Sequence, residues 1–422
     1  MADPSMASVL KAYWFPLILF ASSMVYQLVV LPRSYPPSHY SVLGINERAS
    51  IEEVTEAHKK LLSQWTSGTE DSSTVDLFKI QYAFELLTNP LWKRDYDIFN
   101  IDENIHANEM VKKQHVGTSF SQINLPLLEA VSFDSEDHVF NVVTSENFHS
   151  KFENGKALLV QVFSFGSNRC AKFSNKWKRI AALLGGVANT GMVELGDVPL
   201  ATYLAQKSFT GQPFFQSGLP SLLVFPPGCN TSNCLLRYEG ELSVDAITDW
   251  VATTILSLPR IPYYSKDALA QRFLAKSSPH KVKVIFFSET GERATPFVRR
   301  TALNYSPYAA FAFVPWREEE SSYWWNVFGV ESAPAVIFLK EPGVKPVVYH
   351  GHYNDSQFSS VMEENKNHEL TQLRTVTSME LGCDPRGYSR AGNEIEIWYC
   401  VIVAGRSSPE LNKMREVRCL VL

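Results

Sequence analysis

The chain has 422 residues, of which 45% are hydrophobic and 12% are aromatic, and its formal net charge is −5. This length suggests about three domains, and the weakly acidic charge argues against a nucleic-acid-binding protein. The 6 cysteines are too few for a disulfide-rich scaffold. We find no zinc pattern and no nucleotide-binding motif, so we predict no metal site and no cofactor.

The first element is an uncharged stretch, residues 12–31, which lies between Lys11 and Arg33. A helix of about twenty residues is about 30 Å long, which matches the hydrocarbon thickness of a bilayer. We therefore predict a transmembrane or signal-anchor helix, with a cleaved signal peptide as the alternative. The flanking charges are balanced, so they do not set its orientation.

Triplets of the Asn-x-Ser/Thr type occur at Asn230, Asn304 and Asn354. Such triplets are acceptors for N-linked glycans on secreted proteins. No later stretch is long enough to span a membrane, so we expect everything after residue 33 to lie in one compartment. We predict that this compartment is the lumen of the endoplasmic reticulum, with the chain attached to its membrane.

Residues 36–100 have the pattern of a helical domain. Apolar residues recur at helical spacing in 51–62 and in 78–87, which predicts two helices packed antiparallel. Ser50 and Glu53 form a capping box for the first helix, and Pro90 ends the second. With His39-Tyr-Ser-Val-Leu-Gly-Ile45 before them and Trp92-Lys-Arg-Asp-Tyr-Asp97 after them, these helices resemble a J domain.

The resemblance implies an Hsp70 partner, which active J domains stimulate through a His-Pro-Asp loop between the two helices. Here the loop positions are occupied by Thr66, Ser67 and Gly68, so none of the three residues is retained. Lys59 and Lys60 match the basic patch of the family, with a solvated helix face as the alternative. We predict a J-like domain that folds but does not stimulate Hsp70, and that contacts Hsp70 weakly at most.

After a polar stretch at 101–135, which we predict to be a mobile linker, an α/β pattern covers residues 138–258. Leu158–Phe163 is typical of a strand buried on both faces, and Lys172–Leu184 has helical spacing. Further along, a Leu-Pro step at Pro220 leads into another apolar strand. This order resembles the thioredoxin fold, and the resemblance implies that Pro220 is the cis-proline beside the active site.

The resemblance also places the Cys-x-x-Cys motif of the family on Ser167, Asn168, Arg169 and Cys170. The attacking cysteine of that motif is an exposed thiolate, and a serine hydroxyl cannot replace it in disulfide exchange. In addition, Gln161 stands where the family has a buried acid that relays protons. We therefore predict that this domain is redox-inactive.

Cys229 and Cys234 bracket the triplet at Asn230. In an oxidising compartment they either close a disulfide at a hairpin tip or remain two thiols, and the sequence leaves both alternatives open.

The α/β pattern repeats over residues 266–376, beyond a stiff linker that contains prolines. Strands are predicted at Lys281–Phe287, Ala309–Val314 and Ser332–Phe338, and helices at Thr295–Leu303 and Tyr323–Phe328. This segment resembles a second thioredoxin-like domain, with Pro334 as its cis-proline and no cysteine in its active-site loop. Residues 377–422 begin a third unit that one strand and one helix do not complete. We therefore predict a truncated or alternatively spliced form.

Together the segments predict a multidomain protein of the α and α/β classes. It would have an N-terminal hydrophobic helix, a J-like domain, two thioredoxin-like domains and the start of a third. This order resembles the DnaJ homologues of subfamily C, in particular member 16 and its plant relatives. The resemblance implies a chaperone-type protein that binds client polypeptides.

Because both active motifs are degenerate, we predict a non-catalytic adaptor of the endoplasmic reticulum membrane and no enzymatic activity. One alternative is a thiol-dependent protein that retains or isomerises clients through Cys170. The other alternative is an Hsp70 co-chaperone that acts through its J domain.

Overall fold

The computed structural model describes residues 6–27, 37–66, 74–102, 126–128, 141–152, 154–264, 268–277, 281–288, 293–314, 318–340, 345–351 and 356–367. The predictions for residues 377–422 and for most of the linker lie outside these ranges. The chain divides into two compact units. Unit 1 comprises Met1–Ser132 and Lys207–Phe214, and unit 2 comprises Phe133–Gln206 and Phe215–Leu422.

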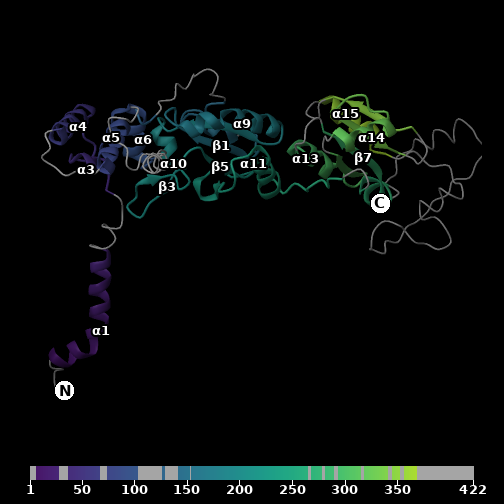
Figure 1. Cartoon of the computed structure of the whole chain (residues 1–422). Coiled ribbons are helices and arrows are strands. Elements are labelled where there is room, and N and C mark those ends of the chain that lie inside the picture. The colour runs from purple at the N-terminus through teal and green to yellow at the C-terminus, as the bar shows by residue number, and fades with distance from the viewer. Residues whose placement is uncertain are drawn as a thin grey trace, which may run out of the picture. The chain divides into compact units, whose positions relative to one another are not determined.

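Helix α1 spans Met6–Val25 and includes Lys11 and Pro16 (Figure 1). Within the ranges described above, no helix is both long and apolar enough to cross a membrane. The predicted transmembrane helix over residues 12–31 is therefore not found. The helix begins earlier than predicted, so it takes in the charge of Lys11, and the apolar residues 28–31 lie outside the described residues.

Unit 1 also contains the J-like helices α3 (His39–Leu43), α4 (Ile51–Thr66), α5 (Thr74–Thr88) and α6 (Pro90–Phe99). The predicted capping box begins α4: the Ser50 N–H donates to Glu53 Oε2 at 2.8 Å, and the Glu53 N–H donates to Ser50 Oγ at 3.2 Å. The predicted apolar faces of α4 and α5 form the core of these helices, with Val54, Tyr82, Ala83, Leu86 and Leu87 all buried.

Residues 126–128 pack back onto the J-like helices. Leu128 is buried in their core, and the Glu85 carboxylate accepts the N–H of Leu127 at 2.9 Å and that of Leu128 at 2.7 Å. Hydrogen bonds to an ionised carboxylate are among the stronger ones in proteins. The prediction of a mobile linker over 101–135 is therefore wrong for this stretch, because Glu85 and the core hold it in place.

Unit 2 contains two four-stranded sheets with the same connectivity. The first sheet has the order β2 (Asn189–Glu194), β1 (Leu158–Phe163), β5 (Ser221–Phe225) and β6 (Leu236–Arg237). Strand β1 has the predicted bounds, is buried along its whole length, and pairs parallel with β2 and antiparallel with β5. Helix α9 (Asn168–Leu184) connects β1 to β2. We call this sheet with its helices the first α/β half.

The second sheet has the order β10 (Val347–His350), β9 (Ala335–Leu339), β7 (Val282–Phe287) and β8 (Ala309–Val314). Strand β7 pairs parallel with β8 and antiparallel with β9, and helix α13 (Pro296–Asn304) connects β7 to β8. Helices α14 (Glu318–Phe328) and α15 (Ser356–Asn365) complete this second α/β half, which is green in Figure 1. The mixed helix and sheet composition agrees with the predicted fold class.

The peptide bonds Leu219–Pro220 and Ala333–Pro334 are both cis, and each directly precedes the third strand of its sheet along the chain. The remaining elements are short: η3 (His149–Phe152), α10 (Val198–Leu204), β3 (Gln206–Lys207), β4 (Pro213–Phe214), η4 (Ser232–Cys234), α11 (Val244–Trp250), η5 (Val251–Ile255) and η6 (Leu269–Leu274). Together α11 and η5 form a continuous helical segment at the end of the first half.

Candidate functional site

Ser167 stands at the N-terminus of α9, at the position of the attacking cysteine in the thioredoxin pattern. Its hydroxyl accepts a hydrogen bond from the Cys170 N–H at 3.1 Å, so Ser167 caps the helix. Its exposed fraction is only 2%. The side chain at this position therefore satisfies a backbone donor and presents no nucleophile to solvent.

Cys170 lies on the inner face of α9, the face that also carries Phe173 and Trp177, and is only 1% exposed. A thiol that attacks a client disulfide must be reachable and ionised. The burial of Cys170 therefore argues against the alternative in which this residue retains or isomerises clients.

Gln161 lies in the middle of β1, paired in register with Met192 of β2 and Leu222 of β5. The side chain is fully buried, and neither its amide nitrogen nor its amide oxygen has a hydrogen-bond partner. A buried polar group without a partner costs about 1–3 kcal/mol, and an amide cannot relay a proton as a carboxyl group does. Gln161 is therefore polar at an energetic cost, but its amide cannot relay protons as a carboxyl group at this position would.

The cis-proline of the first half is closed to solvent. Leu219 is 0% exposed and Pro220 is also buried. The exposed Arg169 lies close by, because a Cβ atom added at Gly218, where φ is +69°, would come within 3.3 Å of its Nη1. The surface that the resemblance assigns to client polypeptides is therefore not accessible at Pro220.

The cis-proline of the second half is open. Ser332 is exposed, and Ala333 and Pro334 are half-buried. Strand β9 begins at Ala335, which pairs with Phe287, so Ala333 lies outside the ladder. Within the described ranges, no backbone group is hydrogen-bonded to Ala333, whereas the Ser332 carbonyl accepts His350 Nδ1 at 3.0 Å and the Pro334 carbonyl accepts the Gly351 N–H at 3.4 Å. We call Ser332, Ala333 and Pro334 the Pro334 site.

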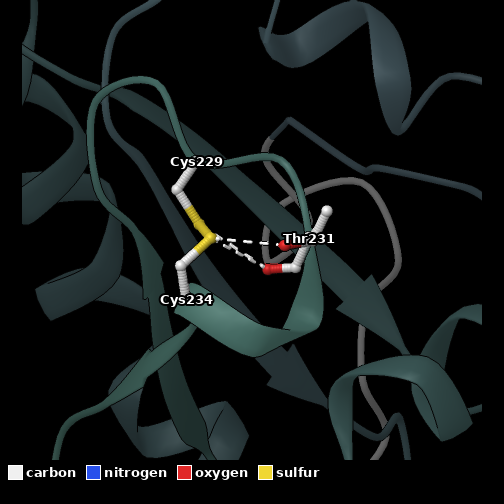
Figure 2. Close-up of a disulfide and its surroundings, with 3 residues drawn as sticks. All are labelled: Cys229, Thr231 and Cys234. Atoms are coloured by element: carbon white, nitrogen blue, oxygen red, sulfur yellow. Dashed lines mark hydrogen bonds between the residues drawn. A yellow bond between two sulfur atoms is a disulfide. The ribbon is translucent and has the colours of Figure 1, made fainter.

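A disulfide joins Cys229 and Cys234 in the loop between β5 and β6 (Figure 2). Cys234 is exposed, whereas Cys229 is 9% exposed. The Thr231 carbonyl oxygen lies 3.3 Å from the Cys234 sulfur and 3.6 Å from the Cys229 sulfur. Of the two alternatives that the sequence leaves open, the structure contains the disulfide.

The remaining predicted site residues do not come together in one place. Lys59 and Lys60 are exposed on α4, and Thr66 ends that helix, while Ser67 and Gly68 lie outside the described residues. Asn230 and Asn304 are exposed. Asn354, like Ser67 and Gly68, lies outside the described residues. In the described part of the chain, no group of three or more His, Cys, Asp or Glu residues is placed to hold a metal ion.

Two features of these sites could not be predicted from the sequence. One is Glu85, which holds the backbone of Leu127 and Leu128. The other is the difference in exposure between Pro220 and Pro334. Neither has a signal in the residue pattern, because both depend on segments that are distant along the chain.

The described residues form a helical unit and two α/β halves whose four-stranded sheets have the same connectivity. No protein-family model matches the chain. DnaJ homolog subfamily C member 10 of Rattus norvegicus is 22% identical over 237 residues, which cover 54% of this chain and 27% of the relative. The Homo sapiens protein of the same name is 21% identical over 221 residues, which cover 52% of this chain and 25% of that relative. The chain thus spans about a quarter of these relatives.

Among solved structures, the match to the crystal structure of ERdj5 form I covers 81% of this chain and 43% of the ERdj5 chain, with 14% identity and a TM-score of 0.30. The J-Trx1 fragment of ERdj5 covers 52% of this chain and 100% of its own, with 20% identity and a TM-score of 0.23. Scores this low do not establish a shared arrangement. The sequence relatives support a DnaJ and thioredoxin-like family.

The prediction that the chain is not an enzyme is wrong. It rested on the degenerate motif from Ser167 to Cys170 and on the degenerate J loop from Thr66 to Gly68, and it left out the pair Cys229 and Cys234. The sequence relatives are DnaJ homologues, and a disulfide on a protein surface can undergo thiol–disulfide exchange. In addition, the first half contains a closed Cys229–Cys234 disulfide with one sulfur on an exposed residue.

Proposed function

We propose that this chain is a chaperone-type protein of the endoplasmic reticulum lumen that binds extended client polypeptides at the Pro334 site. Two observations support the compartment: the DnaJ homologues among its relatives and the exposed acceptor triplets at Asn230 and Asn304. We also propose that its domain plan follows that of DnaJ homolog subfamily C member 16 and its plant relatives.

The proposal rests on the backbone N–H of the half-buried Ala333, which has no hydrogen-bond partner in the part of the chain that the structure describes. An extended peptide can add to a free strand edge through main-chain hydrogen bonds, which requires no particular client sequence. Strand β9 lies between β10 and β7, so a client would pair just before β9 begins, where the Ala333 N–H has no hydrogen-bond partner among the described residues. Leu219, the equivalent residue of the first half, is fully buried and cannot bind in this way without rearrangement.

The J-like helices have a secondary role in the proposal. The exposed Lys59 and Lys60 would allow a weak contact with Hsp70. Stimulation of Hsp70 is not expected, because Thr66, Ser67 and Gly68 replace the coupling loop.

The test is the binding of reduced, carboxymethylated α-lactalbumin to the full chain, measured by fluorescence anisotropy. We expect Ala333→Trp and Ser332→Trp to weaken binding about tenfold, equivalent to about 1.4 kcal/mol. Leu303→Trp is the matched control, since Leu303 is 46% exposed near the end of α13. Unchanged binding in both variants at the Pro334 site would contradict the proposal, provided that both unfold at the wild-type temperature.

A second function, thiol–disulfide exchange at Cys229–Cys234, is favoured by the exposure of Cys234. A client thiolate would attack the Cys234 sulfur, the bond to Cys229 would break, and Cys229 would leave as a thiolate. A second client thiol would then displace Cys234, so that the client gains a disulfide and the chain becomes a dithiol. The reverse sequence would reduce a client disulfide.

This second function predicts which variants trap clients. In Cys229→Ser, the thiolate of the exposed Cys234 should attack a disulfide of scrambled ribonuclease, release one client sulfur as a thiolate and accumulate as a mixed disulfide, seen on non-reducing gels. In Cys234→Ser, the remaining Cys229 is nearly buried and should trap less. Cys170→Ser is the control and should behave as the wild type. Equal trapping by both single variants would argue against selective attack at Cys234.

A further inference from the structure

The acceptor triplet Asn230-Thr231-Ser232 lies wholly inside the ring that the Cys229–Cys234 disulfide closes (Figure 2). We propose that closure of this disulfide blocks attachment of an N-linked glycan to Asn230, so that the redox state of the loop decides whether the site is modified. This inference rests on the proposed location in the endoplasmic reticulum, where glycan transfer and disulfide formation occur on the same growing chain.

The first argument concerns length. The Cα atoms of Cys229 and Cys234 are 6.1 Å apart with a sequence separation of 5. Five residue steps of a fully extended chain span about 17 Å. The closed ring therefore excludes an extended conformation for the triplet, whereas the open loop permits it.

The second argument concerns the conformation inside the ring. Ser232, whose hydroxyl completes the triplet, is the first residue of the 3₁₀-helix η4 (Ser232–Cys234), and its carbonyl accepts the Leu235 N–H at 3.4 Å. The Thr231 carbonyl lies against both sulfurs, and its hydroxyl is 3.5 Å from the Cys234 sulfur (Figure 2). The backbone on either side of the triplet is thus held in a tight turn.

The third argument concerns what a glycosyl transferase must reach. In the reaction, Nδ2 of Asn230 forms a bond to the anomeric carbon of a lipid-linked oligosaccharide. The lipid diphosphate leaves, and the amide loses one proton. The enzyme must bind the Asn230 amide and the Ser232 hydroxyl at once in its own site, which requires this segment to extend away from the fold. A closed ring cannot do so.

The exposure of the side chains in the triplet shows that a glycan is compatible with the closed ring. Asn230, Thr231 and Ser232 are all exposed, so a glycan added before closure does not clash with the folded ring. Closure before transfer, by contrast, removes the acceptor conformation. The disulfide therefore controls the glycan, and the glycan does not prevent the disulfide.

The test is expression of the full chain in secretory cells, with glycosidase-sensitive mobility steps counted on gels. Compared with the wild type, Cys234→Ser should gain one step, and Asn230→Gln in the Cys234→Ser background should lose it. Cys234→Ser is chosen because it opens the ring while Cys229, the neighbour of Asn230, stays unchanged. Asn304 lies outside the ring and serves as the internal control.

Two results would overturn the inference in different ways. Equal occupancy of Asn230 in the wild type and in Cys234→Ser, with glycans present at Asn304, would overturn the control by the disulfide alone. Absence of glycans from every triplet in both chains would overturn the inference together with the proposed compartment.

Discussion

Asp249 and Arg299 form an ion pair in which Arg299 Nη2 donates to Asp249 Oδ1 at 2.6 Å. Asp249 belongs to α11 of the first α/β half and Arg299 to α13 of the second, so the pair joins the two halves within unit 2. Arg260 donates to the second carboxylate oxygen, also at 2.6 Å. The Arg299 side chain is 3% exposed, and its Nη1 has no hydrogen-bond partner. Asp249 is thus the carboxylate that neutralises a buried guanidinium.

We predict that Asp249→Ala destabilises unit 2 by about 2–4 kcal/mol, because it leaves the charge of Arg299 buried and unpaired. Urea unfolding of the full chain, followed by tryptophan fluorescence, measures this loss. Glu239→Ala is the control, since Glu239 is an exposed acid in the same half and should change stability little. A loss of the same size in both variants would contradict the assignment.

The same carboxylate predicts a pH dependence. Burial alone would raise the pKa of Asp249, but hydrogen bonds from Arg260 and Arg299, together with their charges, hold the pKa below its ordinary value. A lowered folded pKa contributes stability above the unfolded value of about 3.9, and that contribution is lost as pH falls through the folded value. The stability difference between wild type and Asp249→Asn should therefore be constant near pH 7 and shrink below about pH 4. A difference that grows on acidification would contradict this.

Glu85 allows a local prediction about the linker. Glu85→Gln should release Leu127 and Leu128, because an amide nitrogen then faces one of the two N–H groups that the carboxylate accepts. An unsatisfied buried group costs about 1–3 kcal/mol, so exchange of these two amide hydrogens should accelerate about tenfold to a hundredfold. Hydrogen-exchange mass spectrometry measures these exchange rates, and Glu56→Gln is the control because Glu56 is exposed. Unchanged protection of both amides would show that the core, and not Glu85, holds this segment.

Ser167 allows a prediction about the lost motif. Ser167→Ala should cost about 1 kcal/mol, the usual value of a helix cap. Ser167→Cys restores the cysteine pair with Cys170 but should remain slow in insulin reduction, because Gln161 has no carboxyl group to relay a proton. The double variant Ser167→Cys, Gln161→Asp should be faster than Ser167→Cys alone. If the two have equal rates, the position of Gln161 does not limit this chemistry.

Several features could be predicted from local sequence. The bounds of β1 follow from an uninterrupted apolar run, and the capping box follows from Ser50 and Glu53 three residues apart. The repeat of strand, helix and X-Pro-strand is visible because side-chain periodicity is a property of neighbouring residues. The replacement of the thioredoxin and J motifs needs only the residue identities at Ser167 and Thr66.

Only the tertiary structure decided which of these positions is accessible and what each one contacts. Leu219 and Ala333 occupy equivalent places before a cis-proline, yet Leu219 is buried and Ala333 is half-buried. Asp249, which pairs with Arg299, lies 50 residues from it, and Leu127 and Leu128 lie 42 and 43 residues from Glu85. Periodicity records which way a side chain points within its own element, whereas burial and charge pairing depend on what folds against it.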